Sequence, residues 1–142
     1  MTRLALVAAA VLLLRHCDPA GPRPDDAVIG TWGGDNAGLI VDDTSAHVHI
    51  ACTFGGIHQP IALDPAGRFD VPGDYVLRAY PVYVGPAHPA RFHGTVSGRA
   101  MALTVTVTDT VADSTVVLGP VHVVQGEEPR MQVCPICRVR RP

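Results

Sequence analysis

The stretch Met101-Ala102-Leu103-Thr104-Val105-Thr106-Val107-Thr108 decides the fold class, because two kinds of side chain alternate along its whole length. Successive side chains of a strand point to opposite faces, so a period of two is typical of a half-buried β-strand. One face holds the apolar residues Met101, Leu103, Val105 and Val107, and the other holds Ala102, Thr104, Thr106 and Thr108. The stretch predicts a strand with a core face and a threonine outer face.

The neighbouring residues extend this strand into an antiparallel sheet. The segment Thr95–Arg99 contains Ser97-Gly98, a plausible hairpin turn that would pair the strand with Arg91–Val96. Turn residues then recur about every 8–12 residues from Val28 onward, which favours a barrel or sandwich. The clearest predicted strands are Ser45–Phe54, Ala90–Val96, Ala100–Thr110 and Thr115–Val124, and weaker ones are Val28–Trp32, Gly38–Val41, Ile57–Leu63, Arg68–Val71 and Tyr75–Val84.

Glycine and proline pairs predict where these strands turn. Asp64–Gly67 reads as a hairpin turn, because Pro presets φ and Gly supplies a left-handed position. Gly55-Gly56 and Pro72-Gly73 predict further bends. Residues 80–89 hold three prolines, which predicts an edge strand breaking into a loop. The fold class expected from these patterns is all-β, a small antiparallel barrel or a sandwich of about eight strands.

The composition of the chain supports this expectation and narrows its function. Among 142 residues there are 20 Val and 11 Arg but no Lys and only two Glu, so a helical bundle is disfavoured. A hydrophobic share of 47% argues against wholesale disorder. The net charge of -2 argues against a general nucleic-acid partner. This charge conceals a balance of -8 over residues 18–129 and +4 over residues 130–142.

The N-terminus is similar to an export signal. A short positive region at Thr2-Arg3 precedes the 11 apolar residues Leu4–Leu14, a length within the range of a signal h-region. Cys17 follows, as in a bacterial lipoprotein signal, although Arg15 and His16 stand where small residues are expected. We therefore predict export to the periplasm, cell envelope or exterior, with lipidation of Cys17 and a membrane contact through that lipid.

The chain then divides into four parts. Residues 1–17 form the leader, and residues 18–27, rich in Pro, Gly and Asp, form an extended tether. Residues 28–129 form the β-barrel domain. Residues 130–142 form a basic tail that contains two of the four cysteines.

Gly30-Thr31-Trp32 resembles the G-x-W motif of lipocalins and related calycin barrels. This resemblance implies a structural role for Trp32, closing one end of the barrel, with Arg130 as a packing partner. A calycin-like interior could hold a small apolar ligand, and at this size it could equally be filled by Val and Leu. More broadly, the course from Trp32-Gly33-Gly34 through Gly67-Arg68-Phe69 to the final Cys-containing segment resembles small uncharacterised bacterial secreted proteins, a resemblance that implies no particular activity.

The cysteines outside the leader leave three alternatives open. Cys52 could form a disulfide with Cys134 or with Cys137, which would staple the tail across the barrel. The Cys134–Cys137 pair could instead supply two zinc ligands, joined by Cys52 and by a histidine such as His49. The same C-x-x-C could also act as a thiol-disulfide oxidoreductase, although no βαβ context surrounds it.

The parity of the strand around His47 and His49 bears on the zinc alternative. Both histidines fall on one face, a spacing that can chelate a metal, and the opposite face holds Val48, Ile50, Cys52 and Phe54. His49 and Cys52 would meet around one ion only across a β-bulge.

Enzyme signatures are poor, since most acidic residues stand at turns and the three serines lack a nucleophile elbow. We therefore expect a non-enzymatic binding or structural module without a cofactor, and the alternative is a zinc protein.

Overall fold

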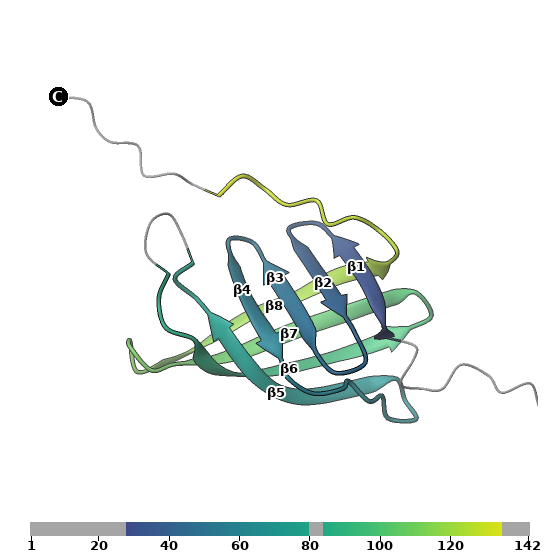
Figure 1. Ribbon diagram of the computed structural model, residues 1–142, viewed down its shortest axis with the longest axis horizontal. Coiled ribbons are helices and arrows are strands. Elements are labelled where there is room, and N and C mark those ends of the chain that lie inside the picture. Colours follow the sequence, from purple (N-terminus) through teal and green to yellow (C-terminus); the bar gives the residue numbers. More distant parts are fainter. Residues whose placement is uncertain (1–27, 80–83, 135–142) are drawn as a thin grey trace, which may run out of the picture.

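The computed structural model describes residues 28–79 and 84–134, which form eight antiparallel strands and no α-helix (Figure 1). The strands are β1 (Gly30–Gly34), β2 (Ala37–Val41), β3 (Ala46–Ile50), β4 (Thr53–Ile57), β5 (Arg68–Val76), β6 (His88–Ser97), β7 (Ala100–Asp109) and β8 (Ser114–Gln125). The predicted leader with Cys17, the tether 18–27 and Cys137 lie outside the described residues. In the part of the chain that is described, no helix is long and apolar enough to cross a membrane.

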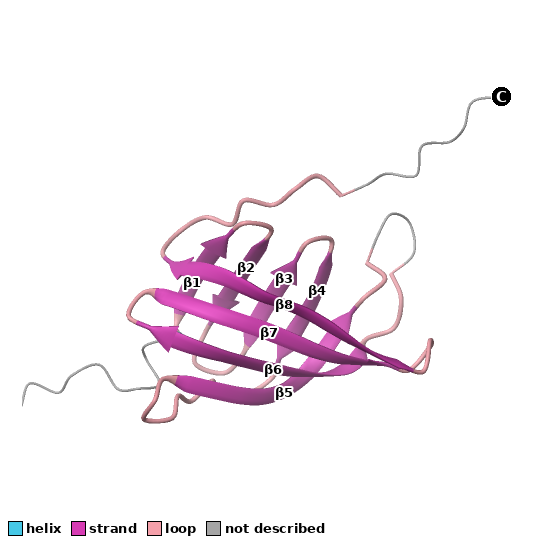
Figure 2. Ribbon diagram, turned by 180° about the vertical axis from the view of Figure 1, so that it is seen from behind, coloured by secondary structure: helices cyan, strands magenta, loops and turns pink. Residues whose placement is uncertain are grey.

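The strands form a meander that closes on itself. Each strand pairs with the next along the chain, and β1 also pairs with β8 through Trp32–Gly34 and Val123–Gln125. Short strands β1–β4 make one wall, and the longer strands β5–β8 make the opposite wall (Figure 2). Closure leaves no open sheet edge for another chain to pair with. The predicted all-β barrel is confirmed, and the sandwich alternative is excluded.

Strand β7 behaves as its alternation predicts. Its four large apolar residues are all at most 1% exposed and line the interior, whereas the threonines lie on the outer side. The strand pairs with β6 through the predicted hairpin, in which Gly98 takes a φ of 58°. A left-handed residue at this position is what the turn needs, and glycine supplies it without steric cost.

The prediction of one strand over Ser45–Phe54 is wrong, because this segment is two strands. β3 ends at Ile50 and β4 begins at Thr53. Ala51 turns the chain with a φ of 51°, and its N–H donates a 2.7 Å hydrogen bond to the carbonyl of Asn36. Alanine is an uncommon residue for this conformation. The turn depends on a partner far from it in the chain, so its residue types do not signal it.

Other predicted boundaries also shift. β5 continues from Arg68 through Pro72-Gly73 to Val76, so no bend lies there. Of the predicted strand Ile57–Leu63, only Ile57 belongs to a strand. The turn at Asp64–Gly67 forms as predicted, with a φ of 74° at Gly67, but it joins a loop to β5. The prediction Tyr75–Val84 reaches residues 80–83, which lie outside the described ranges.

Three glycines inside strands have a packing role instead of a turning role. The Tyr75 ring lies over Gly55 and the Phe92 ring over Gly73, so a Cβ atom at either glycine would overlap the ring. Gly94 is covered in the same way by Phe69, whose ring carbons lie 2.7 and 2.8 Å from the position of an added Cβ. The large rings fit the narrow barrel because the strand beside each of them carries no side chain at that point.

The interior is filled by large side chains. Those that are fully buried include Trp32, Tyr75, Phe92, Ile57, Met101 and Leu103. Trp32 is 0% exposed, and its indole Nε1 donates a 2.7 Å hydrogen bond to the carbonyl of Val28. A buried indole N–H needs such a partner. Trp32 thus packs in the core and ties the residues just before β1 to the barrel.

Candidate functional site

The residues after β8 form a strap, Gly126–Cys134, that runs back over the ends of β1–β3. Gly126 donates to the carbonyl of Thr31 at 2.7 Å. Arg130 forms an isolated parallel bridge with Asp35, in which Asn36 donates to the Arg130 carbonyl and Arg130 donates to the Gly34 carbonyl, both at 3.0 Å. Main-chain hydrogen bonds therefore hold the strap to the barrel at Gly126 and at Arg130.

Glycines beneath the strap let it lie close to the barrel. A Cβ atom at Gly33 would overlap the backbone of Glu128, and one at Gly38 would lie 2.7 Å from Cβ of Pro129. These separations are shorter than van der Waals contact. The small residues of β1 and β2 thus form a seat for the strap.

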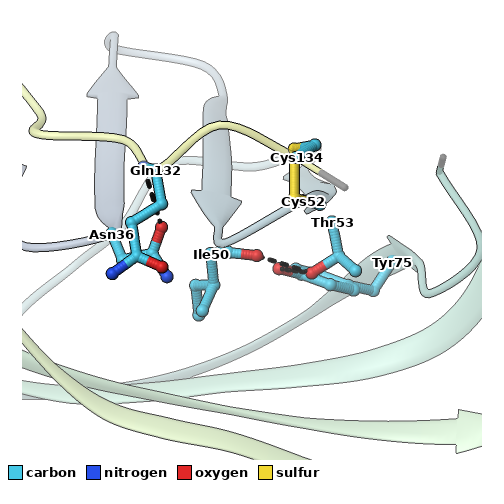
Figure 3. The surroundings of a disulfide bond; sticks show 7 residues. All are labelled: Asn36, Ile50, Cys52, Thr53, Tyr75, Gln132 and Cys134. Carbon is cyan, nitrogen blue, oxygen red and sulfur yellow. Dashed lines mark hydrogen bonds between the residues drawn. A yellow bond between two sulfur atoms is a disulfide. The ribbon is translucent and has the colours of Figure 1, made fainter. Parts of the chain in front are cut away.

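A disulfide fastens the end of the strap to the turn between β3 and β4 (Figure 3). Cys52 and Cys134 are bonded, their Cα atoms lie 5.6 Å apart, and 82 positions separate them in the chain. Next to Cys52, Thr53 Oγ1 donates to the Ile50 carbonyl at 2.7 Å and lies 3.0 Å from the Tyr75 hydroxyl. At the strap, Gln132 donates to Asn36 Oδ1 at 3.3 Å. Of the predicted pairings, the structure contains the one with Cys134.

Arg130 has other partners than the tryptophan that the lipocalin resemblance implies. Its guanidinium lies 2.7 Å from Asp35 Oδ1 and 3.5 Å from Glu127 Oε2. The hydrogen bond to Asp35 is the main cause that raises the Arg130 pKa. Trp32 instead makes its hydrogen bond to Val28. In this barrel Arg130 holds the strap in place.

The residues predicted to bind zinc are not brought together. The sulfur atoms of Cys52 and Cys134 are bonded to each other and so are not thiolate ligands, and Cys137 lies outside the described residues. His49 lies on the outer face of β3. Among residues 28–79 and 84–134, no group of three or more His, Cys, Asp or Glu side chains is arranged to hold a metal ion.

The outer face of β3 and β4 carries the two histidines together with Phe54. The turn at Ala51 places Phe54 directly opposite His49, so the ring lies on the same side as the histidines. The expectation that Phe54 shares a face with Val48 is therefore wrong. The alternation of side chains along β3 does not continue into β4, because the chain turns at Ala51 between the two strands. Ring centroids are 4.8 Å apart for the two histidines and 5.6 Å apart for His49 and Phe54.

An open hollow of about 470 Å³ lies between this outer face and the strap. Its wall includes both histidines, Ile40 from β2, and Pro129 and Met131 from the strap. Ile40 is 62% exposed and presents an apolar side chain to this hollow. The hollow is thus partly apolar and carries two imidazoles, and its shape depends on the strap staying in place.

A polar network that the sequence did not predict ties Arg78, just after β5, and His88 of β6 to the end of β7. Asp109 is buried, and its carboxylate accepts hydrogen bonds from Arg78 Nη2 at 2.6 Å and from two backbone N–H groups, those of Val111 and Ala112. The Arg78 hydrogen bond is the largest cause that holds the Asp109 pKa well below its usual range.

Fully buried His88 completes the network. Its Nδ1 accepts the Thr110 N–H at 3.1 Å, and its Nε2 lies 3.3 Å from Arg78 Nη1. Every buried side-chain nitrogen and oxygen in the described ranges has a hydrogen-bond partner. Because these polar groups bond to one another, the network fixes the chain at this end of the barrel. The only sequence signal for it was Asp109 following the best strand, a position that turn chemistry also explains.

Comparison of the chain with protein-family models, with characterised proteins and with solved structures finds no match.

Proposed function

We propose that this chain is an exported, lipid-anchored and non-enzymatic module of the cell envelope, which presents the outer walls of its barrel to a partner. The observation that carries this proposal is the Cys52–Cys134 disulfide, which closes the strap over the barrel. Disulfides form and persist in oxidising compartments and are rare where glutathione and thioredoxin keep thiols reduced. A fold that depends on one therefore fits the export signal read in residues 1–17.

The packing of the barrel supports binding on the outside. Large side chains occupy the interior, and they include three aromatic rings that each lie over a glycine of a strand. An open hollow of about 700 Å³ lies beside Arg68, Asp70 and His93 on the outer side of β5–β7. We therefore place the binding surface of this module on its walls and not in its lumen.

The zinc and thiol–disulfide alternatives need the cysteines in another state than the exported module does. Zinc binding through the C-x-x-C and thiol–disulfide exchange both need Cys134 as a thiolate. The bond between Cys134 and Cys52 occupies this sulfur. The exported module needs the bond intact, so the redox state of Cys134 discriminates between these functions.

The intact mass of the protein made from its full gene, with thiols counted under denaturing conditions, tests the proposal. We expect a chain that lacks the leader, carries lipid on Cys17, and weighs two hydrogens less than the reduced form because of one disulfide. An unprocessed chain with Met1 in the cytoplasmic fraction and four free thiols would overturn the proposal.

The anchor has its own test. Cys17→Ser should move the protein from the membrane fraction to the soluble exported fraction, whereas Cys137→Ser, the matched control, should leave it with the membrane. Equal distribution of both variants and the natural chain would show that Cys17 carries no anchor.

A further inference from the structure

Two imidazoles stand side by side on the outer wall of the barrel. His47 and His49 alternate with the buried Val48 along β3, so both side chains leave the same face. Their ring centroids lie 4.8 Å apart at an interplanar angle of 67°. Both residues are exposed, so an ion from solvent reaches them without any opening of the barrel.

The surroundings hold this pair in place. Phe54 on the neighbouring strand packs against both rings, with centroid distances of 6.0 Å to His47 and 5.6 Å to His49. Gly56 lies directly opposite His47 and has no side chain of its own to place beside that imidazole. Rings that packing restrains lose less conformational freedom on binding a ligand.

We propose that His47 and His49 form an open two-imidazole site for a divalent transition-metal cation, with Cu²⁺ as the preferred ion and water completing the coordination. Neutral imidazole suits Cu²⁺, Ni²⁺ and Zn²⁺, and binding strength at nitrogen ligands is greatest for Cu²⁺. A structural zinc site needs four protein ligands. Within the described ranges no third ligand joins the pair, so this site is an open one.

A nearby histidine shows why the site stays open. His58 lies beside Gly56, with its ring carbon Cε1 3.1 Å from the position of an added Cβ atom. Its Nε2 is held 2.6 Å from Asp74 Oδ2. The hydrogen bond to Asp74 directs the His58 ring toward β5 and engages its Nε2. We therefore assign the cation to His47 and His49 without His58.

The charge of the surroundings favours binding. Glu128 of the strap and the two histidines line the same hollow, which adds a negative charge near an incoming cation.

Calorimetry with Cu²⁺, Ni²⁺ and Zn²⁺ on the mature, tag-free protein tests this site, with free thiols alkylated because thiolates also bind copper. We expect one cation per chain, tighter binding of Cu²⁺ than of Ni²⁺, and a copper paramagnetic resonance spectrum with nitrogen splitting. Each of His47→Gln and His49→Gln should weaken binding by at least about tenfold, since changes to outer-shell groups alone cost about 10–100-fold.

The matched controls are His93→Gln and His122→Gln, which remove exposed histidines from β6 and β8. Both should keep the affinity of the natural protein. Copper binding that persists in His47→Gln/His49→Gln, or that falls equally in the controls, would overturn the proposal, as would tighter binding of Zn²⁺ than of Cu²⁺. The measurement uses purified protein, so its result does not depend on export or on the anchor.

Discussion

Removing the disulfide should lower the free energy of unfolding by a predictable amount. Cys52→Ser leaves the strap attached only by its hydrogen bonds and ion pairs, and it releases the loop that the bond closes in the unfolded chain. The two cysteines stand 82 positions apart. The loop-closure entropy for this separation corresponds to about 4.5 kcal/mol at 25 °C.

This figure is an upper value for two reasons. The strap keeps its contacts with Thr31, Gly34 and Asn36 in the variant, and these restrain it without the bond. Disulfides also deliver less than the entropy model in many proteins, typically about 2–4 kcal/mol. We therefore expect a loss of between about 2 and 4.5 kcal/mol, a large share of the about 5–15 kcal/mol of a typical domain.

Urea unfolding of the mature protein, followed by tryptophan fluorescence, measures this loss. Trp32 is the only tryptophan of the chain and is fully buried, so its emission reports the opening of the barrel. The midpoint should fall, and the slope m should rise, because the unfolded chain without the bond exposes more surface. Reductant should bring the natural protein to the stability of the variant and leave Cys52→Ser unchanged.

Cys137→Ser is the control, because its sulfur is not part of the bond between Cys52 and Cys134. It should unfold at the midpoint of the natural protein. A loss below about 0.5 kcal/mol in Cys52→Ser, which is within the ordinary range for surface changes, would refute the reasoning. An equal loss in the control would show that the staple uses Cys137 instead.

Three further predictions concern the interior and the barrel end. Trp32→Ala should lower the free energy of unfolding by about 3–5 kcal/mol, or prevent folding, because it leaves a large cavity; its urea unfolding is followed by circular dichroism, since the variant lacks the only tryptophan of the chain, and a loss under about 1 kcal/mol would contradict the packing of Trp32. Gly73→Ala should cost about 1–3 kcal/mol, because its methyl group would overlap the ring of Phe92, and calorimetric melting that matches the natural protein would count against this. Arg78 and backbone N–H groups hold the pKa of Asp109 in the folded protein below its usual value. Asp109 therefore contributes stability above pH about 4, where the carboxyl of the unfolded chain is ionised, and this stability is lost as the pH falls further. Melting temperatures measured from pH 7 to pH 2 should therefore fall less steeply in Asp109→Asn, and parallel curves would rule out this contribution.

The alternating residues of β7 determined the fold class by themselves. Alternation is a local property of the chain, and burial of one face follows from it directly, as the interior position of Val105 shows. The hairpin at Gly98 was also predictable from local sequence, since Ser97-Gly98 is a turn pair and glycine adopts its φ of 58° without steric cost. The presence of a staple from the tail was one of the alternatives that the cysteine spacing allowed.

The candidate sites depended more on contacts between distant residues. Phe54 joined the histidines because the chain turns at Ala51, whose N–H donates the supporting hydrogen bond to the carbonyl of Asn36. The Arg78–Asp109 pair joins residues 31 positions apart. No local pattern encodes such a pair, because each residue alone is ordinary for a loop or a turn.

The sequence by itself determined that this protein is all-β, where its best strand runs, and that its tail contains cysteines able to form a disulfide. Only the tertiary structure decided that the sheet closes through β1 and β8, that Cys134 is the partner of Cys52, and that Gly55 and Gly73 make room for aromatic rings. The physical reason is that strand formation depends on the period of neighbouring side chains, whereas closure, pairing and packing depend on which distant residues meet when the barrel forms.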